Sequence, residues 1–284
     1  MDKIDWEEIW RDAVCGRTDE MLENQRDDRL YWSKRAQNYS DSQTADDFIF
    51  GRSVCEALEE KLNPEDSIID IGAGPGTITI PLAEKVRKAT IVEPASGMVQ
   101  VFRENAAKKR LNNYEVINCG WEEYDAEKNE DVFDLAVSSH VLWHFSDIWK
   151  EISRIEKVSK GYCCLVNGIN GDTGFEKLKE KITGKINTKG YSPSLHLILY
   201  NLLFEKGRKA DVKIIEYKQN IPVESWISSR EMVIARYIDM TSEIKKTIRE
   251  YFLSRSNDGV FPARTTAAVM TWKKPETGEM YETV

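Results

Sequence analysis

A glycine-rich turn is the part of this sequence with the most definite chemistry. The stretch from Ser67 to Ala83 reads SIIDIGAGPGTITIPLA, in which Gly72, Gly74 and Gly76 follow directly after a short apolar run. Glycines at this spacing leave the backbone bare, so a ligand can touch the main chain. If a helix begins after the turn, its free N–H groups also face the ligand. The stretch therefore predicts a small-ligand site at the end of an apolar strand.

The residues around the turn indicate which class of ligand it binds. A dinucleotide-binding turn reads GxGxxG, and its third glycine would fall at position 77, which is Thr77 in this chain. The apolar run ends in Asp70 instead, so the pattern reads D-x-G-x-G-P-G. A carboxylate at that place repels a pyrophosphate and favours a cationic ligand. We therefore expect a ligand with positive charge.

The elements that position this turn alternate between apolar strands and helices from about residue 50 onward. Near-continuous apolar strands joined by helices predict a parallel sheet with helices on both faces. We expect strands at 67–72, 89–94, 114–119, 132–139, 161–168, 212–223 and 265–273, and helices at 48–62, 77–87, 96–110, 147–158, 195–207, 228–238 and 242–255.

Two segments fall outside this alternation. Residues 1–45 have a helical pattern and carry large aromatic side chains, which we expect to be buried because exposed aromatics forgo a favourable burial. The stretch 170–194 is charged and rich in glycine, which predicts a mobile surface excursion. Its basic run, 177–189, is interpreted as a solvated loop, with a patch for an anionic substrate or a nucleic acid as the alternative.

Four ordered segments together resemble the class I S-adenosylmethionine-dependent methyltransferases over about residues 50–168. They are the glycine turn, TIVEPASGM with Glu93 at a strand end, NCGWEE at 118–123, and the run from Val137 to Val166 with its histidine-containing turn. The resemblance implies that Glu93 holds the ribose hydroxyls of the cofactor and that the NCGWEE loop packs on its adenine. It implies the following cofactor-binding residues: Asp70, Gly72, Ala73, Gly74, Gly76, Glu93, Pro94, Met98, Trp121, Glu122 and Ser138.

One of these segments departs from the pattern of the family. Its usual aspartate in the loop after the third strand is replaced here by Cys119-Gly120-Trp121. Adenine recognition would then depend on Trp121 and Glu122 or on the backbone alone. Trp121 is either an adenine platform or a core aromatic, and the sequence leaves both alternatives open.

Candidate catalytic residues are His140, His144 and Tyr39. The two histidines follow the fourth strand, and histidine accepts a proton near neutral pH with little tuning. Such a base is needed for a hydroxyl or ammonium nucleophile, but not for a thiolate or a tertiary amine; the alternative for both histidines is a packing role. Residues 29–41 resemble a segment that small-molecule members place over the methionine end of the cofactor. That places Tyr39 near the methyl group and Tyr31 and Trp32 at the pocket mouth, unless they form a packing stripe.

The resemblance predicts a Rossmann-like α/β fold with a doubly wound, seven-stranded, mostly parallel sheet of order 3-2-1-4-5-7-6, its last strand antiparallel. We expect a helical lid at 1–48 and a methyltransferase domain at 49–284, with a cofactor-binding half (49–168) and a substrate-side half with helical insertions (169–284).

The predicted activity is methyl transfer from S-adenosylmethionine to a small-molecule acceptor. The alternatives are a protein or RNA methyltransferase, or a cofactor-binding protein without transferase activity. The net charge of −8 disfavours a nucleic-acid partner. Without an apolar run of membrane-spanning length or a metal-ligand motif, we expect no membrane partner, no metal and a cytoplasmic location. The acceptor atom and the oligomeric state stay open.

Overall fold

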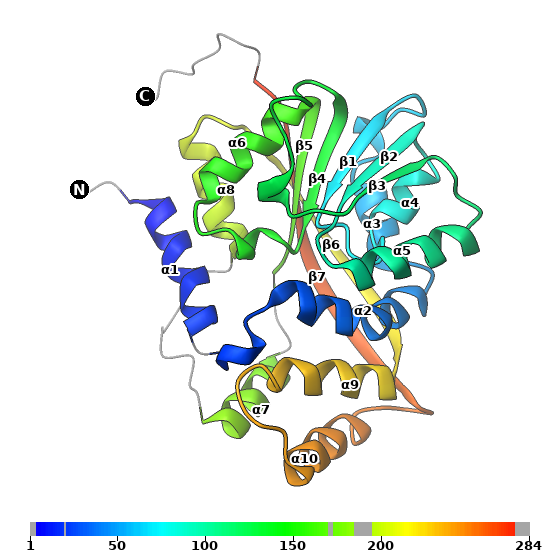
Figure 1. Cartoon of the computed structure of the whole chain (residues 1–284), viewed down its shortest axis with the longest axis vertical. Helices are drawn as coiled ribbons and strands as arrows, with labels where there is room; N and C mark the ends of the chain where they lie inside the picture. The colour runs from blue at the N-terminus through cyan, green and yellow to red at the C-terminus, as the bar shows by residue number, and fades with distance from the viewer. Residues whose placement is uncertain (1–3, 20, 170–172, 185–194, 276–284) are drawn as a thin grey trace.

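The computed structural model describes residues 4–19, 21–169, 173–184 and 195–275 (Figure 1). Its seven-stranded sheet has the order β3-β2-β1-β4-β5-β7-β6. Strands β1 to β5 are parallel to their neighbours, whereas β7 is antiparallel to β5 and β6, which confirms the predicted topology. The strands are β1 (Ser67–Ile71), β2 (Lys88–Val92), β3 (Tyr114–Ile117), β4 (Phe133–Ser139), β5 (Ser159–Gly168), β6 (Asp211–Pro222) and β7 (Val260–Lys273).

Both faces of the central strands are covered by helices, because β1 is apolar at positions that face opposite ways. Ile69 and Ile71 belong to one core cluster, whereas Ile68 belongs to another. The first cluster includes residues of α1 (Trp6–Asp19), α6 (Ile148–Val158) and α8 (Leu195–Glu205), and the other face is covered by α3 (Ile49–Ala57), α4 (Thr79–Ala83) and α5 (Ser96–Lys108). α4 is shorter than the helix that the pattern predicts at 77–87.

The N-terminal segment consists of two helices with different environments. α1 lies against α8, where Trp10 is fully buried and its Nε1 donates to the Phe145 carbonyl at 2.8 Å. α2 (Asp28–Thr44) packs between α5 and α9 (Val223–Ile234), and a short 3₁₀ turn at Glu23–Gln25 separates it from α1. In Figure 1, α2 crosses below the lower ends of β1 to β4, whereas β6 and β7 extend past it, so α2 covers the edge where the glycine turn lies.

A small helical cluster lies beyond α2 and is formed by α7 (Thr173–Thr183), α9 and α10 (Ser242–Leu253) (Figure 1). The expected mobile excursion is wrong at 173–183, because Phe175 and Leu178 recur at helical spacing and are buried against α9 and α10. The remainder of that prediction, at 170–172 and 185–194, lies outside the described residues, as does the end of the basic run 177–189.

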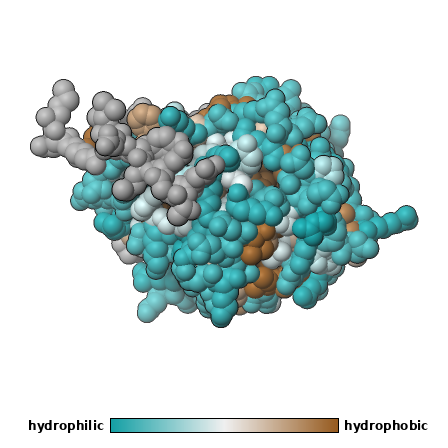
Figure 2. All heavy atoms as spheres, turned by 90° about the horizontal axis from the view of Figure 1, so that it is seen from above, coloured by the Kyte–Doolittle hydropathy of each residue, from teal (hydrophilic) through white to brown (hydrophobic). Residues whose placement is uncertain are grey.

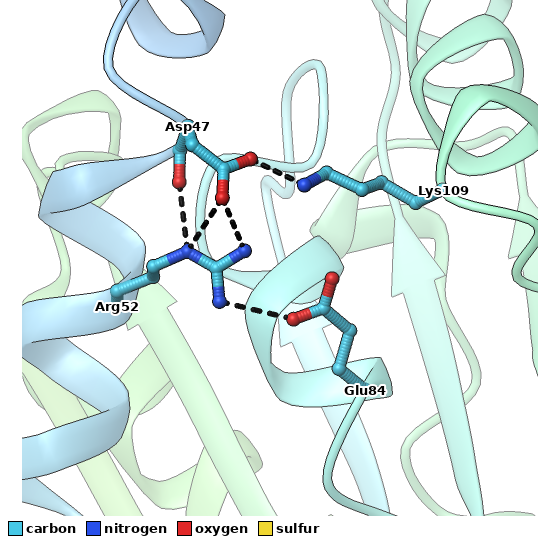
Figure 3. A network of polar contacts seen from close by, with 4 residues as sticks. All are labelled: Asp47, Arg52, Glu84 and Lys109. Atoms are coloured by element: carbon cyan, nitrogen blue, oxygen red, sulfur yellow. Dashed lines mark hydrogen bonds and ion pairs between the residues drawn. The ribbon is translucent and has the colours of Figure 1, made fainter.

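A polar network fixes the corner between α2 and α3 (Figure 3). Asp47 and Phe48 both adopt left-handed backbone conformations there, so the chain turns sharply. Arg52 donates to the Asp47 carboxylate at 2.7 Å and to Glu84 at 3.1 Å, and Lys109 also pairs with Asp47. Because Glu84 follows α4 and Lys109 follows α5, the network ties the ends of these two helices to the turn between α2 and α3.

The surface seen from above is mainly hydrophilic, with separate apolar areas (Figure 2). Within the described ranges, no helix has the length and apolar character that crossing a membrane would require. Among the same residues, no group of three or more His, Cys, Asp or Glu side chains could hold a metal ion.

Candidate functional site

A small pocket, partly open to solvent, lies at the carboxyl ends of β1 and β4. The glycine turn forms its floor, α2 and α3 contribute one aromatic side chain each, and the end of β4 closes it. Its lining consists of Tyr39, Phe50, Asp70, Gly72, Ala73, Gly74, Pro75, Thr77, Ile78, Ser139 and His140. The site predicted from the glycine spacing is therefore a real concavity, and it brings together residues from four different elements.

The glycines of the turn differ in what surrounds them. A Cβ on Gly72 would lie 2.3 Å from the Val141 side chain, and one on Gly76 would lie 2.7 Å from Phe102, so both are required for packing. Gly74 has a left-handed φ of +57°, and only the Met98 sulfur, at 4.0 Å, lies near the place of its Cβ. Gly74 therefore leaves open space for a ligand.

Asp70 is buried at the end of β1, where its Oδ2 accepts a 2.5 Å hydrogen bond from the Thr79 hydroxyl. Burial raises the pKa of Asp70 to about 7, with the nearby Glu93 charge acting in the same direction. A cation in the pocket would favour the charged carboxylate, since opposite charges attract strongly away from water. The position thus suits the cationic ligand that the sequence predicted.

Glu93, at the end of β2, is also buried, and its two carboxylate oxygens bind backbone rather than side chains. Oε2 accepts the Gly74 N–H at 2.9 Å, and Oε1 accepts the Ala95 N–H at 2.8 Å. Burial raises the pKa of Glu93 even though both hydrogen bonds lower it. Because a carboxylate offers about four acceptor sites, capacity for hydroxyl donors is left after these two bonds.

The other predicted cofactor residues line the space around Gly74 or lie behind it. Met98 is buried under α2, Pro94 is half-buried, and Ala73 lines the pocket. Ser138 is fully buried at the end of β4, and its hydroxyl has no hydrogen-bond partner. An unsatisfied buried hydroxyl next to the site is a polar group that a ligand could complete.

The loop after β3 does not present an open aromatic face. Trp121 is buried in the core, where it stacks on Tyr124 with ring centroids 5.2 Å apart and lies under the Arg154 guanidinium. These contacts favour the core-aromatic alternative over an adenine platform. Glu122 is exposed, whereas its neighbour Glu123 pairs with Arg29 of α2 at 2.6 Å.

His140 is the candidate catalytic side chain that reaches the pocket. It adopts an unusual φ of +56°, its Nδ1 shares a 3.0 Å hydrogen bond with the Ser139 hydroxyl, and its ring meets Phe50 edge-on. The side chain of His140 is partly exposed to solvent at the pocket, and desolvation by the protein atoms around the ring lowers its pKa to about 4. The imidazole is therefore neutral near pH 7 and able to accept a proton.

His144 is held elsewhere and is not among the residues that line this pocket. Its Nδ1 donates to Asp28 at 3.1 Å, and Asp28 also pairs with the buried Arg236 at 2.6 Å. Burial would raise the pKa of Asp28, but the hydrogen bonds and charges of these two partners lower it overall. The triad joins the start of α2, the turn after β4 and the end of α9.

The aromatic residues of α2 form a cluster around a cation that the sequence analysis missed. Tyr39 lines the pocket, and Trp32 contacts both Tyr31 and Tyr39 edge-to-face. The guanidinium of Arg35 lies among all three rings, 5.1–5.8 Å from their centroids. The spacing of Tyr31, Arg35 and Tyr39, four residues apart on one helix, was a signal that could have found it.

The residues present fit S-adenosylmethionine as a cofactor. Three observations support the fit: the open backbone at Gly74, the unsatisfied Ser138 hydroxyl, and the buried Asp70 carboxylate in the pocket lining, which favours a cationic ligand.

Comparisons with known proteins agree with this geometry. A family model described as "Methyltransferase domain" matches residues 62–213, which is more than half of the chain. A protein of Methanobrevibacter smithii named "probable cobalt-precorrin-6B C(15)-methyltransferase (decarboxylating)" is 28% identical over 160 residues, covering 56% of this chain and 79% of that relative. An uncharacterized methyltransferase of Schizosaccharomyces pombe is 22% identical over 244 residues, covering 77% and 82%. The YcgJ protein of Bacillus subtilis has the same fold, with a TM-score of 0.50, 21% identity and coverage of 79% and 98%.

Proposed function

The chain belongs to the methyltransferase-domain family and is an S-adenosylmethionine-dependent methyltransferase, and we propose that its acceptor is a small molecule bound beneath α2. The observation that carries this proposal is the convergence of Tyr39 and His140 on one pocket with the glycine turn. A lid helix directly above the turn leaves room for a small acceptor and excludes water from the reaction.

Each end of the cofactor would be held by a different part of the site. Glu93 would accept the ribose hydroxyls while it keeps the turn in shape through Gly74. Asp70 and the open backbone at Gly74 would face the charged methionine end. When bound, the cofactor supplies an activated methyl group and its own leaving group, so the protein has mainly to align the acceptor and exclude water.

His140 would act as the general base when the acceptor atom is a hydroxyl or an ammonium nitrogen. Its neutral ring can accept that proton, and the Ser139 hydrogen bond at Nδ1 holds the ring in place. Phe50 supports the ring from one side, and Tyr39 faces the same pocket from α2, where burial raises the pKa of its phenol and keeps it protonated. Tyr39 would thus position the acceptor as a hydrogen-bond donor.

The lid in this proposal is α2 together with the helices that hold it. α2 contacts α5 closely enough that a Cβ on Gly97 would lie 2.5 Å from the Ser33 carbonyl oxygen. On its other side it packs on α9, and Asp28 joins it to His144 and Arg236. α2 is therefore held on both sides over the partly open pocket, and its closure on a bound acceptor would exclude water, which is the usual role of a lid in an enzyme.

The test is methyl transfer from radiolabelled S-adenosylmethionine to three acceptor pools: small-molecule extract, RNA and total protein. We expect label in the small-molecule pool, with loss of transfer in His140→Gln but retained binding of S-adenosylhomocysteine by calorimetry. Label confined to RNA or protein would refute the small-molecule acceptor. Cofactor binding without transfer to any pool would support a binding protein instead.

A further inference from the structure

Arg35 is a buried cation whose contacts are all neutral. Its side chain lies in the middle of α2 and is only 9% exposed. Nη1 donates to the Tyr31 hydroxyl at 3.1 Å and Nη2 to the Ser229 hydroxyl of α9 at 2.6 Å. Nε is buried and has no hydrogen-bond partner. The ring centroids of Tyr31, Trp32 and Tyr39 lie 5.1–5.8 Å from the guanidinium carbon.

Burying such a charge without an anion is unfavourable, which makes the arrangement unusual. Buried charges in proteins are normally paired, because taking an ion out of water without a partner is costly. Cation–π contact with three rings offsets only part of this cost. Among the described residues, Arg35 forms no ion pair with a carboxylate.

A second arginine in the same region provides the comparison. Arg236 is as deeply buried as Arg35 and also lies over the Tyr31 ring, at 4.3 Å from its centroid. It pairs with Asp28 at 2.6 Å. The fold thus pairs Arg236, which holds α2, with a carboxylate. Arg35, which lies nearer the pocket, has hydroxyl hydrogen-bond partners only.

The position of Arg35 connects it to the acceptor pocket. Its guanidinium lies 5.6 Å from the ring centroid of Tyr39, and Tyr39 lines the pocket beside His140. One aromatic side chain therefore separates the positive charge from the acceptor space. Arg35 itself does not line the pocket, so an anionic group that displaces the Tyr39 ring would reach the guanidinium, complete the Nε donor and replace the Ser229 hydroxyl at Nη2.

We infer that Arg35 binds an anionic group of the methyl acceptor, so that this enzyme methylates acidic small molecules. The inference rests on the proposed function, because it assigns the substrate class of the same pocket. A guanidinium recognises carboxylate or phosphate through paired N–H donors, and this pairing is strongest away from water. Neutral analogues would leave the buried charge unpaired and bind weakly.

The test separates a small-molecule extract by ion exchange into anionic, neutral and cationic fractions and offers each with radiolabelled S-adenosylmethionine to the full-length protein. We expect the wild type to label the anionic fraction. Arg35→Met should raise KM for that fraction by roughly 10- to 100-fold, as lost charge-assisted hydrogen bonds would, with a smaller effect on kcat. The KM of Arg35→Lys should lie between those of wild type and Arg35→Met, because lysine keeps the charge but lacks the paired N–H donors of the guanidinium.

Two measurements exclude a merely structural role. S-adenosylhomocysteine affinity should stay within about 3-fold of wild type in both variants, a difference of less than 1 kcal/mol. The anionic fraction should raise the unfolding temperature of wild type saturated with S-adenosylhomocysteine, but not that of Arg35→Met. Lys34→Met removes an exposed charge from the adjacent position of α2 and should behave as wild type.

The outcomes are distinguishable. Label only in neutral or cationic fractions, or an unchanged KM in both Arg35 variants, would overturn the inference while leaving the proposed function intact. Loss of S-adenosylhomocysteine affinity in Arg35→Lys would assign the charge to the cofactor carboxylate instead and equally overturn it. A wild type that binds cofactor but labels no fraction would overturn the proposed function and this inference together. If Arg35→Met does not fold, the KM and affinity of Arg35→Lys decide.

Discussion

Glu93 holds Gly74 in place: its Oε2 accepts the Gly74 N–H at 2.9 Å across 19 residues of sequence. The bond joins the end of β2 to the turn after β1, while Oε1 binds the Ala95 N–H at the start of α5. Glu93 therefore shapes the turn with the same carboxylate that is expected to bind the ribose. Its substitution removes a ligand contact and loosens the turn at once.

Glu93→Ala should weaken S-adenosylhomocysteine binding by about 10- to 100-fold, because charge-assisted hydrogen bonds to ligand and loop are both lost. Glu93→Gln keeps one acceptor oxygen, and we expect it to lose less. Isothermal titration calorimetry measures both, with the exposed Glu104→Ala on α5 as the matched control. Equal affinity in Glu93→Ala and wild type would contradict the assigned role.

Gly74 and Gly76 should fail in different ways when each is replaced by alanine. Both have positive φ, so each alanine costs about 1–2 kcal/mol in backbone strain. The added Cβ at Gly76 also meets Phe102 at 2.7 Å, whereas at Gly74 it enters the open ligand space. We therefore expect Gly76→Ala to lower the free energy of unfolding more than Gly74→Ala does. Relative to its loss of stability, Gly74→Ala should lower cofactor affinity more than Gly76→Ala does. Denaturant unfolding and calorimetry on both variants check this, and the reverse ranking would be evidence against the placement of the ligand.

Asp70 should make the unliganded protein less stable as the pH rises. Its folded pKa of about 7 exceeds the unfolded value of 3.8, so the folded state binds the extra proton in between. The stabilising contribution is complete below the unfolded pKa and is lost as the pH rises through about 7. Asp70→Asn still accepts the Thr79 hydrogen bond but cannot titrate. Its free energy of unfolding, relative to that of wild type, should therefore rise by on the order of 2–3 kcal/mol from pH 5 to pH 8.

Urea unfolding of the cofactor-free protein at the two pH values measures this difference. Asp239→Asn, an exposed carboxylate after α9, is the matched control and should show no such trend. A stability difference between Asp70→Asn and wild type that is constant with pH would mean that Asp70 does not titrate in this range.

His140→Gln should lower the rate of methyl transfer by about 10²- to 10⁴-fold, the usual contribution of a general base. Because the pKa of His140 is about 4, the ring stays neutral well below the ordinary histidine value of 6.5. The wild-type rate should therefore not fall between pH 8 and pH 6 through protonation of this residue. Initial rates over that range test the point.

His144→Gln distinguishes the two candidate bases. Since His144 is bonded to Asp28 and does not line the pocket, its loss should affect closure of α2 and raise KM more than it lowers kcat. A drop in kcat for His144→Gln with none for His140→Gln would reverse the assignment.

Trp10→Ala should lower the free energy of unfolding without changing the cofactor site. Trp10 is fully buried between α1 and the core and bonds the Phe145 carbonyl, so removal leaves a cavity and an unpaired acceptor. We expect a loss of about 3–5 kcal/mol, measured by denaturant unfolding. Cofactor affinity of the folded fraction should match wild type. Reduced affinity with unchanged stability would mean that α1, like α2, acts on the site.

The α/β fold class and the place of the glycine turn could be predicted from local patterns, whereas the order of the strands was implied by the resemblance to the methyltransferase family. Apolar runs, helical spacing and the glycine turn are short-range signals, and they indicate the fold class and the positions of Asp70 and Gly74 at the ligand site. The role of Glu93 was implied by the resemblance. The same local patterns led to a wrong prediction for α7, a mobile surface excursion, because its amphipathic face is short and lies in a stretch rich in charges and glycines. Its burial depends on α9 and α10, which follow much later in the chain.

Contacts between distant segments set the remaining features. Whether Trp121 faces a ligand or the core, and whether His140 or His144 reaches the pocket, depends on side-chain direction at the ends of strands. The neutral partners of Arg35 come from Tyr31 on its own helix and from Ser229, 194 residues away. Spacing along a chain reports the period of one element, whereas burial, pairing and pKa arise where elements pack together, so these properties follow from the tertiary structure alone.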